Sequence, residues 1–300
     1  MTVSADELGP ARVNAVSTRT AHLRRILRGR AAGYALGLGV VGAVVAGAWL
    51  RSPLAMLIAP AAVVALVLLV SFRTASARAE REFFVSFAQE RGLRYTGDFV
   101  LPPLTPLLAA GDRRECRHWM VGPVGDGVPG LSCGLGHYTF YERRHRSDEG
   151  SHLVPHHLTV CVVDLEPGIV MFPGVFLARR RGLAGLLGHG WLSTTNRRQV
   201  ELESISLHER YELWVERSQD DLLLRELFSP SFVAWLAEHP LEPCFEYRAG
   251  TLVVYLERRL EDAAHLGWLQ DATAVIATRL AREVGEATGA GGASTRAALR

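Results

Sequence analysis

The motif GLSCG at residues 130–134 has the G-x-S-x-G spacing of a nucleophile elbow, with Ser132 in the place of the nucleophile. In such an elbow the serine lies on a strained turn between a buried strand and a helix, and a histidine and an acid activate it. Asp164 and His189 follow Ser132 in a suitable chain order. The neighbouring residues instead favour a glycine-rich turn that leads into a strand, because glycine and proline interrupt the chain before the motif and HYTFYE follows it. We therefore expect no catalytic residue, and a membrane-tethered serine hydrolase that uses Ser132 is the alternative.

Two groups of side chains are of the types that bind zinc or another transition metal. They are His145, His152, His156 and His157 in one group, and Cys116 with His118 in the other. A catalytic metal site would add a positioned carboxylate or thiolate, and Pro155 would disrupt a helix that aligned histidines four residues apart. The favoured interpretation of the histidine group is a polar flank of a hairpin, so we expect no metal and no cofactor.

A third pattern is the G-x-G-x-x-G spacing of a dinucleotide-binding turn, at Gly37, Gly39 and Gly42. That turn needs a strand before it and an acidic residue about 20 positions later. Here arginine-rich residues precede it, and no Asp or Glu follows until Glu80. Residues 31–50 and 53–72 are instead two uncharged apolar runs, and about 20 such residues cross the roughly 30 Å hydrocarbon core of a bilayer. The sequence therefore predicts a two-helix transmembrane hairpin over residues 31–72.

Arginine placement predicts the orientation of this hairpin. Residues 1–30 are arginine-rich, the link Arg51–Ser52 is short, and further arginines follow the second run. Both termini are therefore expected in the cytoplasm of a multi-pass inner-membrane protein. Small residues recur at every fourth position of the first run, at Gly39, Ala43 and Gly47, so another helix could approach closely. Packing within the hairpin is the favoured partner for that groove, and self-association of the first helix is the alternative.

The composition excludes several enzyme classes. All 33 basic residues of the 300-residue chain are arginines. Without lysine there can be no P-loop lysine, protein-kinase lysine, pyridoxal Schiff base or Ser-Lys dyad. The net charge of +2 gives no indication of a nucleic-acid partner. The four cysteines (Cys116, Cys133, Cys161 and Cys244) form no C-x-x-C pair and are expected to be reduced and mostly buried.

The remainder of the chain predicts a cytoplasmic α+β domain over residues 73–284, with a largely antiparallel sheet and flanking helices. Residues 285–300 are small and polar, and we expect them to be disordered. Helices are expected over residues 76–92, 220–228, 229–239 and 260–284, with Gly92 as a stop and Ser229-Pro230 as a start. Strands are expected over residues 136–144, 157–165, 168–172 and 210–216, and a hairpin over residues 244–257 turns at Ala249-Gly250.

The segment VELESISLHERYELWVERSQDDLLLRELFSPSFVAWLAEH at residues 200–239 resembles an uncharacterised family of membrane-anchored bacterial proteins that carry a domain of unknown function. The shared features are Leu202-Glu203-Ser204, a strand around Trp214, Asp220-Asp221 and Ser229-Pro230, and the similarity covers roughly residues 80–283. Leu207-His208 stands where the family has Phe-Asn. The resemblance implies a domain after a two-helix anchor, and it brings no activity or catalytic residue with it.

Together these patterns predict a bacterial membrane protein whose domain is a non-enzymatic binding or scaffolding module at the cytoplasmic face. The lipid bilayer is its expected partner, and no nucleic acid is expected. The basic run ARRRG at residues 178–182 is most simply a solvated turn, although it could contact anionic lipid headgroups. Asp220 and Asp221 open a helix, where carboxylates favour the positive end of the helix dipole.

Overall fold

The computed structural model describes residues 41, 42, 45, 53–125, 130–146, 150–165, 172–183, 196–202 and 204–297. The chain divides into two compact units, residues 1–87 and 88–300. Four parts of the sequence analysis lie outside the described residues. They are the N-terminal segment 1–30, nearly all of the first apolar run, most of the predicted strand 168–172, and His189.

Helix α3 (Pro53–Glu90) joins the second apolar run and the predicted helix 76–92 into one element. Pro53 occupies its first position, where a missing N–H costs nothing. The predicted stop at Gly92 is confirmed: this glycine has φ +66°, and the Leu93 N–H donates to the Ala88 carbonyl at 2.7 Å. Within the part of the chain that the structure describes, no helix combines the length and the apolar character needed to cross a membrane.

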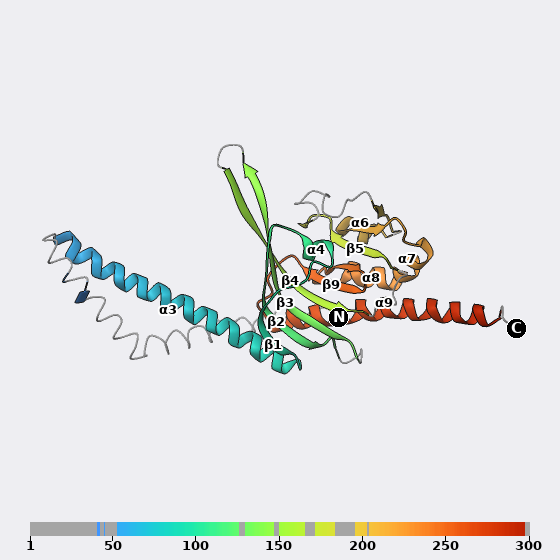
Figure 1. The fold of residues 1–300 in the computed structure, drawn as a ribbon, viewed down its shortest axis with the longest axis horizontal. Helices are drawn as coiled ribbons and strands as arrows, with labels where there is room; N and C mark the ends of the chain where they lie inside the picture. The colour runs from blue at the N-terminus through green and yellow to red at the C-terminus, as the bar shows by residue number, and fades with distance from the viewer. Residues whose placement is uncertain are drawn as a thin grey trace. The chain divides into compact units, whose positions relative to one another are not determined.

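The described residues form one sheet of nine strands in the order β1-β2-β3-β4-β9-β8-β5-β7-β6 (Figure 1). Its strands are β1 (Arg94–Phe99), β2 (Arg113–Pro123), β3 (Ser132–Arg146), β4 (Gly150–Asp164), β5 (Gly174–Arg179), β6 (Arg197–Val200), β7 (Tyr211–Glu216), β8 (Cys244–Arg248) and β9 (Thr251–Leu256). Every neighbouring pair is antiparallel. The predicted α+β class with a largely antiparallel sheet is therefore confirmed.

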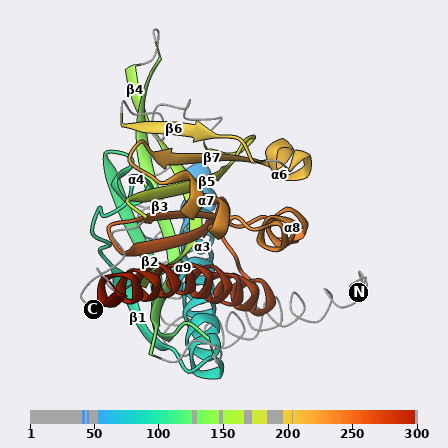
Figure 2. The same cartoon turned by 90° about the vertical axis from the view of Figure 1, so that its right-hand side faces the viewer.

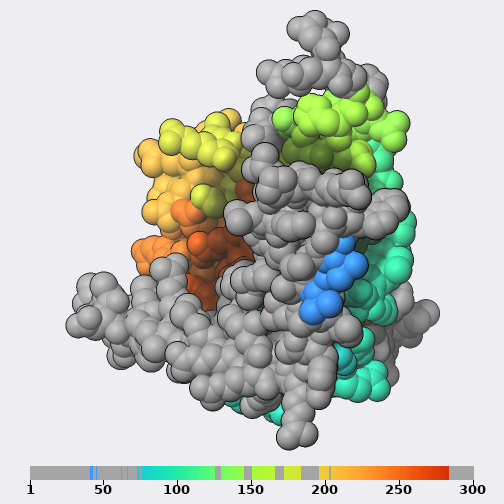
Figure 3. All heavy atoms as spheres, turned by 90° about the vertical axis from the view of Figure 1, so that its left-hand side faces the viewer, coloured from blue at the N-terminus to red at the C-terminus, as the bar shows by residue number. Residues whose placement is uncertain are grey.

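Strands β3 and β4 extend beyond their neighbours as a two-stranded ribbon (Figure 1). β4 pairs with β9 only from Thr159 to Asp164, and β3 pairs with β2 only as far as Tyr141. Within the described part of the chain, the outer halves of these two strands therefore pair only with each other. Figure 3 shows residues of β3 and β4, in light green, on the surface of the molecule. The predicted strands 136–144 and 157–165 correspond to parts of β3 and β4, which pair with each other.

Helices cover both faces of the sheet. They are α4 (Pro106–Ala109), α6 (Ile205–Arg210), α7 (Asp221–Leu227), α8 (Pro230–Glu238) and α9 (Ala263–Ala297). α9 packs on β4 and β9, and α6 packs beside α8 (Figure 2). α4 lies on the opposite face, since the Tyr138 hydroxyl donates to the Leu108 carbonyl at 3.1 Å. On the other face, Thr273 of α9 contacts the thiol of Cys161, the cross-strand partner of Leu135. Because side chains alternate along a strand, Tyr138 points to the face opposite Leu135, so α4 and α9 cover different faces of the sheet.

One end of β3 is built around an indole ring. The side chain of Trp119 on β2 lies directly over Gly134 and Gly136 of β3, and Phe99 of β1 stacks on it with ring centroids 5.4 Å apart. A Cβ atom at Gly134 would lie 1.9 Å from the indole, and one at Gly136 would lie 2.8 Å from it. The absence of a side chain at these two glycines therefore leaves the space that the Trp119 ring occupies.

The predicted start signals of two helices are confirmed. Asp220 is the N-cap of α7, where its carboxylate accepts a hydrogen bond from the Leu222 N–H at 2.7 Å. Asp221 lies in the first turn and forms an ion pair with Arg198. Ser229 is the N-cap of α8 and precedes proline, but its hydroxyl makes no capping hydrogen bond.

This difference between two caps gives a matched pair of variants. Asp220→Ala is expected to lower the free energy of unfolding by about 1 kcal/mol, because it leaves an N–H at the start of α7 without its acceptor. Ser229→Ala removes no capping bond and should cost less than about 0.5 kcal/mol. Urea unfolding of the full-length chain in detergent, followed by circular dichroism, measures both. Equal losses would show that the Asp220 cap contributes nothing specific.

The C-terminal part agrees with the sequence in one element and differs in another. The β8–β9 hairpin turns at Ala249-Gly250 as predicted, with φ of +48° and +81° at the two residues. α9 begins at Ala263, because the Asp262 carboxylate accepts from the His265 N–H at 2.8 Å and so caps the helix. The helix then continues past Val284 to Ala297, through residues that we expected to be disordered and whose alanines favour the helical state.

Candidate ligand pocket

A pocket with a volume of about 550 Å³ lies beside the part of β4 that extends beyond the end of β9. Three segments line it: residues 155–157 of β4, residues 181–183 after β5, and residues 257–259 after β9. β9 ends at Leu256, opposite Thr159, so residues 155–157 have β3 on one side and no described strand on the other. The pocket is thus a consequence of the unequal lengths of β4 and β9.

The backbone that forms one wall of the pocket is held in place by buried side chains. The Thr159 hydroxyl donates to the Arg258 carbonyl and accepts from the Leu260 N–H, both at 2.9 Å. His137 Nε2 donates to the Leu260 carbonyl, also at 2.9 Å. Thr159 and His137 are both buried. The chain after β9 therefore has a fixed path, and the side chains of Arg258 and Arg259 leave it at defined points.

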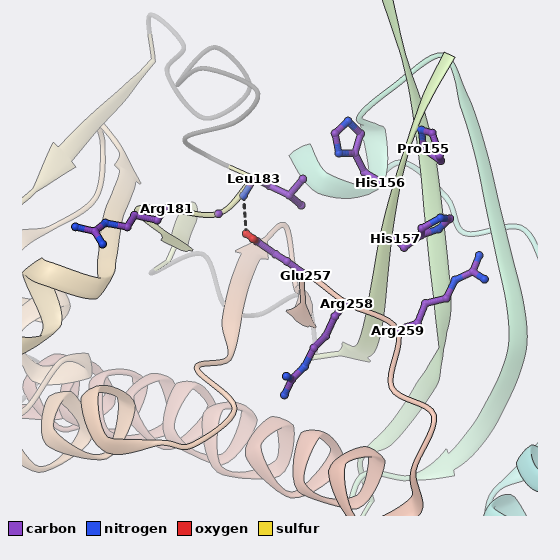
Figure 4. Close-up of a pocket in the computed structure, with 9 residues that line it drawn as sticks. Pro155, His156, His157, Arg181, Leu183, Glu257, Arg258 and Arg259 are labelled. Atoms are coloured by element: carbon purple, nitrogen blue, oxygen red, sulfur yellow. Dashed lines mark hydrogen bonds between the residues drawn. The ribbon is translucent and has the colours of Figure 1, made fainter. Parts of the chain in front are cut away.

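On the opposite wall of the pocket, the side chain of Glu257 contacts the segment that follows β5. The Leu183 N–H donates to Glu257 Oε1 at 2.8 Å, as the dashed line in Figure 4 shows. A Cβ atom at Gly182 would lie 2.2 Å from Glu257 Oε2, so only glycine leaves room for this contact. Burial raises the pKa of Glu257, and the Leu183 N–H and the charge of Arg179 partly oppose that effect. The Glu257 carboxylate thus already has contacts within the protein, with the Leu183 N–H and with Gly182.

The wall formed by β4 and the chain after β9 carries hydrogen-bond donors. Arg259 Nη2 donates to the Thr139 hydroxyl at 3.3 Å, and the same hydroxyl is hydrogen-bonded to His157 Nδ1 at 3.0 Å. Figure 4 shows His157 and Arg259 on this side, away from Glu257. Burial lowers the pKa of His157, and the positive charges of Arg259 and His156 lower it further. This wall therefore has a positive electrostatic potential.

The arginines of the pocket have no carboxylate to neutralise them. Among the residues that the structure describes, none forms an ion pair with Arg181, Arg258 or Arg259. All three are exposed, and Arg181 points away from the two histidines in Figure 4. A solvated surface tolerates such charges, but their collection around one hollow favours a negatively charged ligand there.

The four histidines of the sequence group do not form one cluster. His156 and His157 lie on opposite faces of β4, because successive side chains of a strand alternate. His156 is buried against the Phe140 ring at 4.8 Å between centroids, with Nε2 3.4 Å from Glu142 Oε2. His152 is exposed, and the side chain of His145 is outside the described set. No group of three potential metal ligands occurs in the described segments.

The other zinc-type pair lies on β2. Cys116 is buried, and that burial, together with the charge of Asp98, raises the pKa of its thiol to about 12. Burial thus favours the protonated thiol, whereas metals bind the thiolate. His118 Nδ1 is hydrogen-bonded to the Tyr95 hydroxyl at 3.0 Å.

Ser132 is the first residue of β3, opposite Pro123 of β2. Gly130 before it has φ +88°, so the predicted glycine-rich turn into a strand is confirmed. A nucleophile elbow would need a helix directly after the serine, and a 15-residue strand follows instead. Asp164 is the last residue of β4, directly after Val163, the cross-strand partner of Cys133, so it lies at the same end of the β3–β4 pair as Ser132. Its carboxylate accepts a hydrogen bond from the Thr251 hydroxyl at 3.4 Å.

The basic run at residues 178–182 is only partly a solvated turn. Arg179 forms an ion pair with Glu242 at 2.7 Å. The Arg180 guanidinium lies 3.1 Å from His208 Nε2. Arg181 alone of the three arginines reaches the rim of the pocket.

Sequence reasoning missed a buried carboxylate, Glu246 on β8. It is 1% exposed, and its Oε2 accepts a hydrogen bond from the Leu107 N–H of α4 at 2.8 Å. Its other oxygen has no hydrogen-bond partner among the described residues. Burial raises the pKa of Glu246 to about 7, although the Leu107 and Thr105 hydrogen bonds and the charges of Arg197 and Arg248 oppose the rise. The one signal in the sequence is an acidic residue inside the apolar strand CFEYR.

The chain matches no protein-family model, no curated protein and no solved structure.

Proposed function

We propose that this chain is a non-enzymatic binding module held at the cytoplasmic face of a bacterial inner membrane, with the pocket at the end of β9 as its ligand site. The observation that carries the binding part is the pocket itself, a hollow of about 550 Å³ whose lining includes three arginines that have no carboxylate partner among the described residues. That volume falls in the range that small-molecule sites occupy. The backbone of one wall is fixed by buried hydrogen bonds, so the pocket is formed before a ligand arrives.

The support for the membrane anchor is the sequence. Residues 31–50 and 53–72 are uncharged runs of the length that a bilayer requires, separated only by Arg51-Ser52. Arginines at both outer ends favour the orientation with both termini in the cytoplasm.

Both parts of the proposal can be tested in one preparation. Membranes are washed with alkaline carbonate, and the full-length protein is then released with a mild detergent and examined by native mass spectrometry. We expect the protein to remain in the washed membranes, because an apolar hairpin is not removed by pH or salt. We also expect a species heavier than the 32.8 kDa chain by the mass of a retained ligand. The double variant Arg258→Gln/Arg259→Gln should lose most of that extra mass.

Each contrary result has a distinct meaning. Release into the carbonate wash would overturn the anchor. A bare chain, identical in the wild type and in the double variant, would overturn the pocket as the site of a retained ligand. A doubled mass that persists in the double variant would favour self-association through the first apolar run, the alternative partner for its small-residue groove.

A further inference from the structure

We infer that the pocket binds a phosphoryl group at its β4 wall, carried either by a soluble phosphorylated molecule or by a phospholipid headgroup. The inference rests on the proposed binding function and names the chemical class of its ligand. Its basis is a set of donors fixed around one point, with no carboxylate among them.

The first argument is charge compensation. Several other arginines of this sheet have carboxylate partners: Arg113 and Arg117 with Glu115, Arg144 with Glu142, Arg179 with Glu242, and Arg248 with Glu216. Arg94 and Arg114 have none among the described residues, but they lie on β1 and β2, outside the pocket. The arginines of the pocket have none among the described residues. The pocket is thus a place where this protein leaves positive charge unneutralised, and an anionic ligand would supply the missing partner.

The second argument is the geometry of the donors. Thr139 is buried, and its hydroxyl holds both Arg259 and His157, at 3.3 Å and 3.0 Å. Only one N–H of the Arg259 guanidinium is used in this contact, so the others remain to bind oxygen. A guanidinium matches two oxygens of a phosphate. With the Thr139 hydroxyl donating to His157 Nδ1, the neutral ring carries its hydrogen on Nε2, which is a further donor. Because Thr139 orients both groups in advance, little entropy is lost when the ligand binds.

The third argument is the position of the single acidic side chain. Glu257 lies on the far wall, where the Leu183 N–H occupies one of its oxygens and Gly182 packs against the other (Figure 4). Its charge disfavours an anion on that side and so directs a phosphoryl group towards His157 and Arg259. The lining also includes Pro155 on the β4 wall and Leu183 beside Glu257, whose apolar surfaces suit the less polar body of the ligand (Figure 4).

The test uses the full-length chain in lipid nanodiscs of phosphatidylcholine, with inorganic phosphate as the probe and ³¹P NMR line broadening as the measurement. Wild type should broaden the phosphate signal in a saturable way. Arg258→Gln/Arg259→Gln should weaken binding about tenfold or more, since each lost charge-assisted bond removes roughly that factor. His157→Gln should weaken it severalfold. Arg217→Gln, which removes an exposed arginine beyond β7 and outside the pocket, should remain within twofold of wild type.

Failure to broaden in wild type, or equal broadening in wild type and the double variant, would overturn the inference. The exposed arginines can be replaced without loss of packing, and unchanged circular dichroism verifies that the fold is intact. If phosphate fails while the native mass spectrum shows a retained ligand, the chemical class is wrong and the binding function stands. If both fail, both proposals fall.

A second set of nanodiscs distinguishes the two sources of the phosphoryl group. In one set, one third of the lipid is replaced by phosphatidic acid. In the control set, cholesteryl hemisuccinate, a carboxylate amphiphile, supplies the same total negative charge. A fall in phosphate affinity of fivefold or more with phosphatidic acid, relative to the hemisuccinate discs, identifies a lipid headgroup as the ligand. Equal affinity in the two sets identifies a soluble phosphorylated molecule.

Discussion

Replacement of Gly134 by alanine is expected to lower the free energy of unfolding by about 3 kcal/mol, the upper end of the usual cost of overpacking a core. The new Cβ would lie 1.9 Å from Cζ2 of the Trp119 indole, and further ring atoms would lie at 2.6 and 2.7 Å. Trp119 is 4% exposed, and the Phe99 ring stacks on its indole, so the ring has little room to move. Urea unfolding of the full-length chain in detergent, followed by circular dichroism, measures the loss.

A second glycine and a second substitution provide the controls. A Cβ at Gly125 would meet the nearest atom, Ala274 Cβ, at an ordinary 3.5 Å, so Gly125→Ala should change stability by less than about 1 kcal/mol. In a background with Trp119→Leu, the cost of Gly134→Ala should shrink, because the group that it collides with has gone. An unchanged cost in that background would show that the indole is not the cause.

The second large effect is expected at Glu246 and depends on pH. A pKa raised from the usual 4.5 to about 7 means that the folded state holds a proton that the unfolded state has released. Below about pH 4.5 the group is protonated in both states and costs nothing. Between about pH 4.5 and pH 7 the unfolded state ionises while the folded state keeps its proton, so stability falls across this range. Above about pH 7 both states are ionised and the full loss, about 3 kcal/mol, has been reached.

The variant Glu246→Gln cannot ionise and keeps an oxygen that can accept from the Leu107 N–H. Its stability relative to wild type should therefore increase by about 3 kcal/mol between pH 4.5 and pH 8. Urea unfolding of both proteins at several pH values gives this difference, in which all other titrating groups cancel. A difference that stays level, or that moves in favour of wild type at high pH, would show that the carboxyl gains no net proton on folding.

Much of the fold could be predicted from sequence, because its strongest signals are local. The β8–β9 turn is specified by Ala249-Gly250, which both adopt positive φ, and the end of α3 is specified by Gly92. The start of α7 is set by Asp220, whose carboxylate contacts a residue only two positions away. Signals of this kind need no knowledge of the rest of the chain.

The pocket could not be predicted in the same way, because three distant segments meet there. The sequence places His156 beside His157, but only the strand puts them on opposite faces. The charge of Arg259 matters because Thr139, 120 residues earlier, orients it. The spacing of GLSCG suggested a nucleophile or a turn, whereas Gly134 is explained by an indole from the neighbouring strand. Contacts of this range depend on the register of the sheet.

The unequal lengths of β4 and β9 divide β4 into two regions of different cooperativity. From Thr159 onwards its amides are flanked by strands on both sides, while before that residue they have only β3. The outer part can therefore open as a separate small unit, without unfolding the core. The pocket lies at the boundary between the two regions, at residues 155–157. A ligand bound there would contact both the outer unit and the core. Occupancy of the pocket would therefore slow amide hydrogen exchange along the whole ribbon.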